Sequence, residues 1–255
     1  IEATHQICRI KADGTGEVEV LTKGDHDINS FEVCGDRCVG SVMTISMAPE
    51  LFEFDLLTGA MTKITAVNDF VYDNIELGEV QKRWVKTSDG KKMLTWVILP
   101  PDFDENKKYP VILYVYGGPH SQMVRNSFQA QLRRWEMYMA QRGYVVFVMD
   151  NRGTLYQGAE YEKAIHRQCG KAEMEDQMAG LQWLLSHKWA DKERVGVHGW
   201  SYGGFMTISL ITNYPDVFKV GVAGGPVIDW KWYEVMYGER YMETEATNAE
   251  GFKKV

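Results

Sequence analysis

A serine between glycines, in Gly199-Trp-Ser-Tyr-Gly203, is the clearest candidate for chemistry in this sequence. The apolar run Val195 to His198 precedes it, and apolar residues with helical spacing, beginning at Phe205, follow. Strand, sharp turn and helix are therefore predicted, the context in which the serine of a G-x-S-x-G pattern is a nucleophile. Ser201 would stand at the positive end of a helix, where backbone N–H groups stabilise developing negative charge. The alternative is a glycine-rich turn with a structural role only.

A second candidate element is the stretch Tyr116-Gly-Gly-Pro-His120, which follows a predicted strand. In α/β-hydrolases the loop at this point supplies one oxyanion donor, and the backbone N–H after the nucleophile, here that of Tyr202, supplies the other. Two glycines let the backbone approach a substrate closely. The alternative is again a structural turn.

The elements that must position these residues alternate between strand and helix. Continuous apolar runs, as in Tyr109 to Tyr116 and Tyr144 to Met149, are typical of strands buried on both faces. The pattern predicts a mostly parallel α/β sheet with helices on both faces. The other predicted elements are a hairpin of Arg83 to Thr87 and Met93 to Leu99 with its turn at Ser88 to Gly90, helices at Phe128 to Arg142 and Lys171 to His187, and a strand at Val220 to Ala223.

Residues 1–79 consist of short alternating segments separated by turns, and they are predicted to be all β. Alternating segments around a turn, Ile7 to Ile10 and Val18 to Thr22, return as Leu51 to Asp55 and Met61 to Thr65 after about 44 residues, the length of a β-propeller blade. Two more strands, Phe31 to Val33 and Cys38 to Ser46, are predicted between the copies. We expect the last blades of a propeller, because so few blades cannot close around an axis. The alternative is a free-standing small β domain.

Bulk composition excludes several classes of protein. The 255 residues carry a net charge of −7, which does not favour nucleic acid or an anionic membrane as partner. No apolar run approaches the ~20 residues of a membrane span, and no signal-peptide pattern opens the sequence. The four cysteines are too scattered for a disulfide framework, so we favour free thiols over a Cys34–Cys38 bridge. No metal site or cofactor is predicted.

Four motifs in order resemble the prolyl oligopeptidase family of serine peptidases, and most closely its dipeptidyl peptidase IV and prolyl tripeptidyl aminopeptidase branch. The resemblance covers residues 80–255 well and residues 1–79 more loosely. The motifs are Tyr116-Gly-Gly-Pro-His120, Asp150-Asn-Arg-Gly153, Gly199-Trp-Ser-Tyr-Gly-Gly204 and the segment from Trp230 to Tyr241.

The resemblance implies a propeller, residues 1–79, capping an α/β-hydrolase domain, residues 80–255, with the active site between them. It implies that Ser201 is the nucleophile and that the Tyr116 phenol and the Tyr202 N–H are the oxyanion donors. A histidine usually stands at the position of Tyr116 in the acylaminoacyl branch, so Tyr116 favours the dipeptidyl or tripeptidyl side. The proline-binding pocket would comprise Val227, Trp230, Tyr233 and Tyr237. A peptide substrate, homodimers and export also follow from the resemblance alone.

The histidines depart from the family pattern. A hydrolase triad follows the order Ser, Asp or Glu, His, yet all six histidines precede Ser201. A serine is a poor nucleophile without a base. We therefore expect a segment of a longer serine exopeptidase, truncated at both ends, that cleaves dipeptides or tripeptides from N termini after proline through an acyl-enzyme on Ser201. The alternatives are an acylaminoacyl peptidase or esterase, and a non-catalytic propeller/hydrolase-like binding protein.

Overall fold

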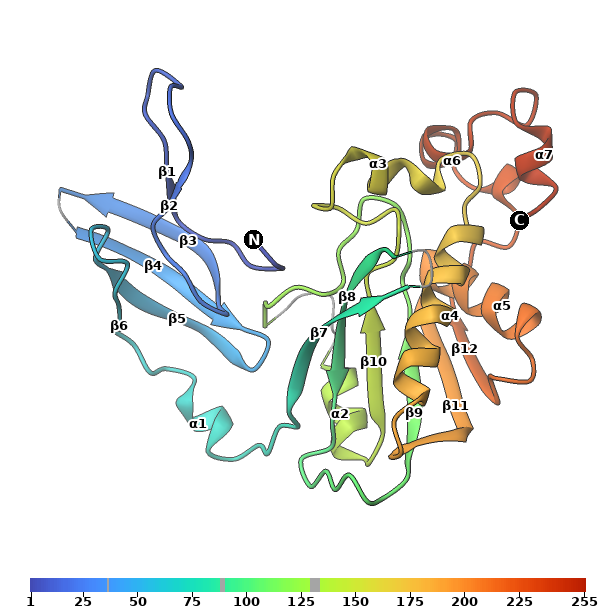
Figure 1. The fold of residues 1–255 in the computed structure, drawn as a ribbon, viewed down its shortest axis with the longest axis horizontal. Helices are drawn as coiled ribbons and strands as arrows, with labels where there is room; N and C mark the ends of the chain where they lie inside the picture. Colours follow the sequence, from blue (N-terminus) through green and yellow to red (C-terminus); the bar gives the residue numbers. More distant parts are fainter. Residues whose placement is uncertain (36, 88–89, 129–133) are drawn as a thin grey trace. The chain divides into compact units, whose positions relative to one another are not determined.

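The computed structural model describes residues 1–35, 37–87, 90–128 and 134–255 (Figure 1). The chain forms two compact units. One comprises Ile1–Leu77 with Arg125–Trp135, and the other comprises Gly78–Val124 with Glu136–Val255.

The first unit is built on an antiparallel meander of four strands in the order β3-β4-β5-β6. A short hairpin, β1 (Cys8–Arg9) with β2 (Glu19–Val20), precedes it, and a short helix, α1 (Asp69–Tyr72), follows it. Alternate residues face a small core that contains Ile28, Val42 and Phe54, as expected for a sheet with one buried face. The four strands are β3 (Asp27–Cys34), β4 (Arg37–Thr44), β5 (Met47–Phe54) and β6 (Met61–Lys63).

A distant piece of the chain belongs to this first unit. Asn126 accepts a hydrogen bond from the N–H of Ile45 at 2.8 Å, and its amide donates to the carbonyl oxygen of Asp25 at 2.8 Å. Its own N–H donates to the carbonyl oxygen of Ala3. Asn126 thus ties the segment that begins at Arg125 to three separate loops.

The second unit is organised around a six-stranded sheet in the order β12-β11-β9-β10-β8-β7. The four strands β10, β9, β11 and β12 run parallel, while β7 and β8 form an antiparallel hairpin that joins β10. The bounds are β7 (Val80–Lys86), β8 (Lys92–Ile98), β9 (Tyr109–Tyr114), β10 (Val145–Met149), β11 (Ala190–Trp200) and β12 (Val220–Gly224).

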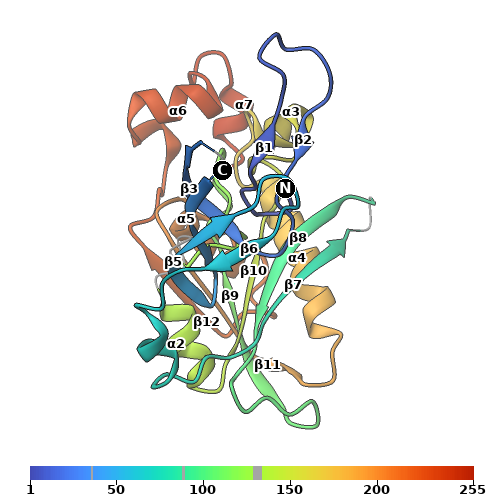
Figure 2. The same cartoon turned by 90° about the vertical axis from the view of Figure 1, so that its left-hand side faces the viewer.

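Helices flank this sheet. Figure 2 shows α2 (Trp135–Gln141) on one face and α4 (Lys171–Leu185) on the other. Helix α5 (Tyr202–Asn213) packs on β11 and β12 and contacts α4. The remaining helical pieces are α3 (Ala159–Glu162), η1 (Lys163–Ile165), η2 (Trp230–Trp232), α6 (Val235–Met242) and α7 (Ala249–Phe252).

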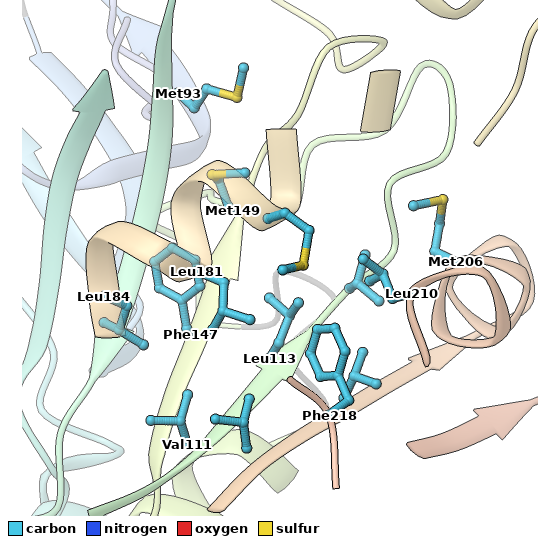
Figure 3. Packing of buried hydrophobic residues seen from close by; sticks show 14 of the residues in the cluster. Met93, Val111, Leu113, Phe147, Met149, Leu181, Leu184, Met206, Leu210 and Phe218 are labelled. Carbon is cyan, nitrogen blue, oxygen red and sulfur yellow. The ribbon is translucent and has the colours of Figure 1, made fainter. Parts of the chain in front are cut away.

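Apolar side chains of the central strands and of α4 and α5 form the main core. Figure 3 shows Leu113 of β9, Phe147 of β10 and Leu181 of α4 among them, and all three are fully buried. Strand β10 is buried at every position, as its uninterrupted apolar run predicts. The core fixes the strands whose carboxyl ends carry the candidate site.

The α/β class predicted from the sequence is confirmed, and individual bounds differ from the prediction. The helix predicted at Phe128 to Arg142 begins only at Trp135, and residues 129–133 lie outside the described part of the chain. The predicted hairpin turn includes Ser88 and Asp89, which also lie outside it. All four cysteines are free thiols, and Cys38 pairs across the hairpin with Val33.

Candidate active site

Ser201 is the single residue between strand β11 and helix α5. Its backbone has φ 60° and ψ −116°, in the left-handed half of conformational space that residues with a side chain rarely adopt. Its N–H donates to the carbonyl oxygen of Gly224 on the neighbouring strand at 2.8 Å. A strained residue of this kind persists only where its surroundings hold it, and such residues cluster at functional sites.

Close backbone contacts explain the glycines around Ser201. A Cβ atom on Gly199 would lie 2.2 Å from the carbonyl oxygen of Val115, and one on Gly203 would also lie 2.2 Å from it. A Cβ atom on Gly204 would lie 2.5 Å from the carbonyl oxygen of Gly224. Each distance is far below van der Waals contact, so the turn can pack between β9 and β12 only without these side chains.

The parallel pairing of β9 with β11 brings Tyr116 to the same place. Leu113 pairs with Val197, and the N–H of Val115 donates to the carbonyl oxygen of His198, so both strands end at one edge of the sheet. The ring centroids of Tyr116 and Tyr202 are 6.1 Å apart. The structure therefore brings Ser201, Tyr202 and Tyr116 together.

Two groups here can donate hydrogen bonds to a developing negative charge. The N–H of Tyr202 belongs to the first turn of α5, whose N–H groups have no partner within the helix. Burial raises the pKa of the Tyr116 phenol, and the neighbouring Tyr233 raises it further. Tyr116 therefore keeps its proton at neutral pH, which a hydrogen-bond donor requires.

The predicted aromatic pocket residues form a contiguous cluster beside Tyr202. The Trp230 ring lies 5.4 Å from that of Tyr202, stacks with Tyr237 at 6.0 Å and meets Tyr233 edge-on at 5.9 Å. Val227 is buried in the same core. Trp230 is 4% exposed and Tyr233 is 37% exposed, so the cluster extends from the core to the surface.

The cluster also contains polar atoms. Within the described residues, the indole nitrogen of Trp230 is buried without a hydrogen-bond partner. Such a group carries a desolvation cost of about 1–3 kcal/mol. The same part of the chain contains no group of three His, Cys, Asp or Glu side chains that could hold a metal ion.

The two histidines nearest to the site in sequence have other contacts. Nδ1 of His198 lies 2.8 Å from the carbonyl oxygen of Val222, and the ring meets that of Tyr114. His198 is half-buried. His120 is exposed, and its ring lies edge-on to Tyr241 at 5.5 Å.

Reasoning from the sequence assigned no role to a set of buried polar residues behind this site, although Asp150 and Asn151 belong to one of the four motifs. They are Asp150 and Asn151 after β10, and Glu173, Asp176 and Gln177 on α4, none of them more than 3% exposed. Burial raises the pKa of both Asp150 and Glu173 to about 7. The available signal was the spacing of polar residues at i, i+3 and i+4 within an otherwise apolar helix face.

Comparisons with known proteins agree with this architecture. Residues 130–255 match the family model described as the prolyl oligopeptidase family. Mouse dipeptidyl peptidase 8 is 42% identical over 154 residues, covering 60% of this chain and 17% of the relative. Dipeptidyl-peptidase 5 of Porphyromonas gingivalis is 34% identical over 210 residues, covering 82% of this chain and 30% of the relative.

A solved structure extends the similarity to nearly the whole chain. Dipeptidyl peptidase 4 of Porphyromonas gingivalis superimposes with a TM-score of 0.70 at 25% identity, covering 98% of this chain and 42% of that one. The chain thus spans less than half the length of each of these three proteins.

The fold and the site define an α/β protein with a strained serine between a parallel strand and a helix. Together with the matches to dipeptidyl peptidases, they establish that this chain belongs to the prolyl oligopeptidase family. None of the helices in the described part of the chain is long and apolar enough to cross a membrane.

Proposed function

We propose that the protein carrying this chain is a serine exopeptidase that removes dipeptides or tripeptides from N termini after proline or a small residue. The observation that carries the proposal is the position of Ser201, strained at φ 60° between β11 and α5 with Tyr116 and the aromatic cluster alongside. The similarity to three dipeptidyl peptidases supports the same class of substrate.

In this proposal the hydroxyl oxygen of Ser201 attacks the carbonyl carbon of the scissile peptide bond, and its proton passes to a histidine base. The carbonyl oxygen becomes negatively charged and accepts hydrogen bonds from the Tyr202 N–H and the Tyr116 phenol. The C–N bond then breaks, and the histidine gives its proton to the leaving amine. Water hydrolyses the resulting ester and frees Ser201.

The aromatic cluster suits a proline ring at the position before the cleaved bond. Flat aromatic faces suit a pyrrolidine ring because its binding there buries apolar area. Trp230 would form the inner wall, since it is buried and contacts Tyr202, and the more exposed Tyr233 would form the rim. Val227 and Tyr237 would complete the pocket.

We further propose that residues 1–79 belong to a β-propeller and residues 80–255 to an α/β-hydrolase domain whose Asp and His lie in sequence beyond these residues. The four-stranded meander β3-β4-β5-β6 has the strand number of a propeller blade. The order Ser, Asp, His in hydrolases explains why every histidine of this chain precedes Ser201.

The test is labelling of the full-length protein with a fluorophosphonate probe, which reacts only with an activated serine. We expect labelling of the wild type and none of the Ser201→Ala variant. Absence of labelling in a folded full-length protein would overturn the proposal in favour of a non-catalytic binding protein.

Substrate choice is tested separately with chromogenic dipeptide, tripeptide and N-acylated amino acid substrates. We expect cleavage of substrates that have a free N terminus and proline before the chromophore. A preference for N-acylated substrates would instead identify an acylaminoacyl peptidase. A comparison of Tyr116→Phe with wild type measures the contribution of the phenol, and we expect kcat to fall about 10²-fold.

A further inference from the structure

Two fully buried polar residues of helix α4, Glu173 and Gln177, bind residues that adjoin the candidate site. Their separation of four residues places both on one face of the helix. Neither side chain is exposed to solvent. A buried carboxyl group and a buried amide in a core helix are costly unless they are hydrogen-bonded, so their partners identify what they hold.

Glu173 is bonded to the residue that follows the nucleophile. The hydroxyl group of Tyr202 donates to Oε1 of Glu173 at 2.5 Å, and the N–H of Gly170 donates to the same atom at 2.9 Å. The Tyr202 ring is held from other sides by Phe205 and Trp230, both with ring centroids 5.4 Å away. Tyr202 is therefore fixed at both its ring and its hydroxyl group.

Gln177 is bonded, through one intermediate, to the loop that carries Tyr116. Its amide donates to Oδ1 of Asn151 at 2.8 Å and to the carbonyl oxygen of Met149 at 3.0 Å. The amide of Asn151 in turn donates to the carbonyl oxygen of Gly117 at 3.0 Å. Gly117 directly follows Tyr116 and has φ 78°, a conformation that the Asn151 bond helps to hold.

The two links converge at the loop itself. A Cβ atom on Gly118 would lie 3.0 Å from the Tyr202 ring and 2.6 Å from the Tyr116 ring. Both rings therefore pack closely against Gly118, so this loop residue contacts the side chains of both donor residues.

We propose that Glu173 and Gln177 are positioning residues that hold the two oxyanion donors at a fixed separation from the single rigid helix α4. Glu173 acts on the Tyr202 N–H through the Tyr202 side chain, and Gln177 acts on Tyr116 through Asn151 and Gly117. The inference rests on the proposed function. Donors to an oxyanion act only when preorganised, so loosening them lowers transition-state binding more than substrate binding.

The experiment compares Glu173→Leu, Glu173→Gln and Gln177→Leu in the full-length enzyme. Leucine removes the hydrogen bonds at similar volume, whereas glutamine at position 173 keeps an acceptor oxygen. We expect both leucine variants to lose about 10–10²-fold in kcat with little change in KM, and Glu173→Gln to stay within about threefold of wild type. Binding of a peptide boronate, which mimics the tetrahedral intermediate, should weaken in parallel with kcat.

A matched control comes from the same helix. Gln182 is an exposed residue of α4, so Gln182→Leu makes the same substitution as Gln177→Leu away from the site. We expect it to keep the kcat of wild type. Tyr202→Phe removes only the hydroxyl group, so it tests the Glu173 link even if the Glu173→Leu protein does not fold, and we expect about tenfold lower kcat.

Two failures are distinguishable. A wild-type enzyme that is neither labelled nor active overturns the proposed function and this inference with it. An active wild type with folded Glu173→Leu, Gln177→Leu and Tyr202→Phe variants of unchanged kcat overturns the positioning role alone. A loss that appears only in thermal stability or KM also overturns it, because it indicates a purely structural network.

Discussion

The guanidinium group of Arg152 donates three hydrogen bonds of 2.6–3.0 Å to the carboxylate of Asp176, and these bonds join the loop after β10 to helix α4. The backbone N–H of Arg152 donates to the same carboxylate at 2.8 Å. Asp176 is 2% exposed, so its charge depends on this partner. The pair anchors the helix that also carries Glu173 and Gln177.

Removing Arg152 should therefore be costly. Arg152→Met leaves the buried carboxylate of Asp176 without its counter-ion, and we expect a loss of about 3–5 kcal/mol in the free energy of unfolding. Arg194→Met provides the control. The ion pair of Arg194 with Asp191, at 2.8 Å, is largely exposed, and surface ion pairs contribute about 0–1 kcal/mol to stability. Thermal unfolding followed by circular dichroism compares the two variants, and equal shifts in Tm would contradict the prediction.

A second prediction concerns the glycines of the turn. Gly203→Ala places a Cβ atom 2.2 Å from the backbone oxygen of Val115, which cannot move without disturbing β9. We expect at least about 1–3 kcal/mol of destabilisation and loss of fluorophosphonate labelling. On the preceding strand, Gly196→Ala meets its nearest atom at an ordinary 3.5 Å, so this control should fold and react like wild type. A Gly203→Ala protein with normal labelling would show that the turn is not closely packed.

The sequence predicted those parts of the fold whose pattern is local. Strands β9 and β10 followed from uninterrupted apolar runs, and α4 followed from helical spacing, its observed end at Leu185 lying two residues before the predicted one. The start of α2 differs from the prediction, because Arg134 has φ 55°, outside the helical region, and residues 129–133 lie outside the described part of the chain. Burial of whole strands leaves a signal in every residue, whereas a helix boundary depends on a few.

The buried network behind the site could not be predicted in the same way. Glu173 and Gln177 look like ordinary helix-forming residues in the sequence, and their partners Tyr202 and Asn151 lie more than 25 residues away in the chain. Only the packing of α4 against the ends of β10 and β11 brings them together. The spacing of Glu173 and Gln177 places them on one face of α4, but it does not indicate which residues of distant elements they bind.

A third prediction is a pH dependence that arises from Asp150. Its carboxylate accepts hydrogen bonds from the N–H groups of Met123 at 2.7 Å and Val124 at 3.2 Å, yet complete burial raises its pKa from 3.8 to about 7. Between about pH 4 and pH 7 the folded protein retains a proton that the unfolded chain has released. The group therefore favours folding less and less as pH rises through this window.

Asp150→Asn tests this, because an amide oxygen can accept both hydrogen bonds and does not ionise. We expect the Tm of the variant relative to wild type to rise between pH 5 and pH 8, by an amount reflecting at most roughly 3 kcal/mol, since only the interval from pH 5 to about pH 7 contributes. Glu173, whose pKa is also about 7, is present in both proteins, so its effect cancels in the difference. A difference in Tm that is constant over this range would mean that Asp150 is ionised throughout.

The last prediction separates a pocket wall from a surface aromatic residue. Tyr233 meets the buried Trp230 edge-on, whereas its neighbour Trp232 is 79% exposed and lies against Lys231. An aromatic contact contributes about 0.5–1.5 kcal/mol beyond its buried area. We therefore expect Tyr233→Leu to lower kcat/KM about tenfold for substrates with proline before the cleaved bond, and less for those with alanine, because only the proline ring fills the pocket.

Trp232→Leu is the control and should leave kcat/KM for both substrates unchanged. The Tm of both variants should be close to that of wild type, since both residues lie at the surface. Equal losses on proline and alanine substrates in Tyr233→Leu would indicate that Tyr233 supports the site without contacting the proline ring.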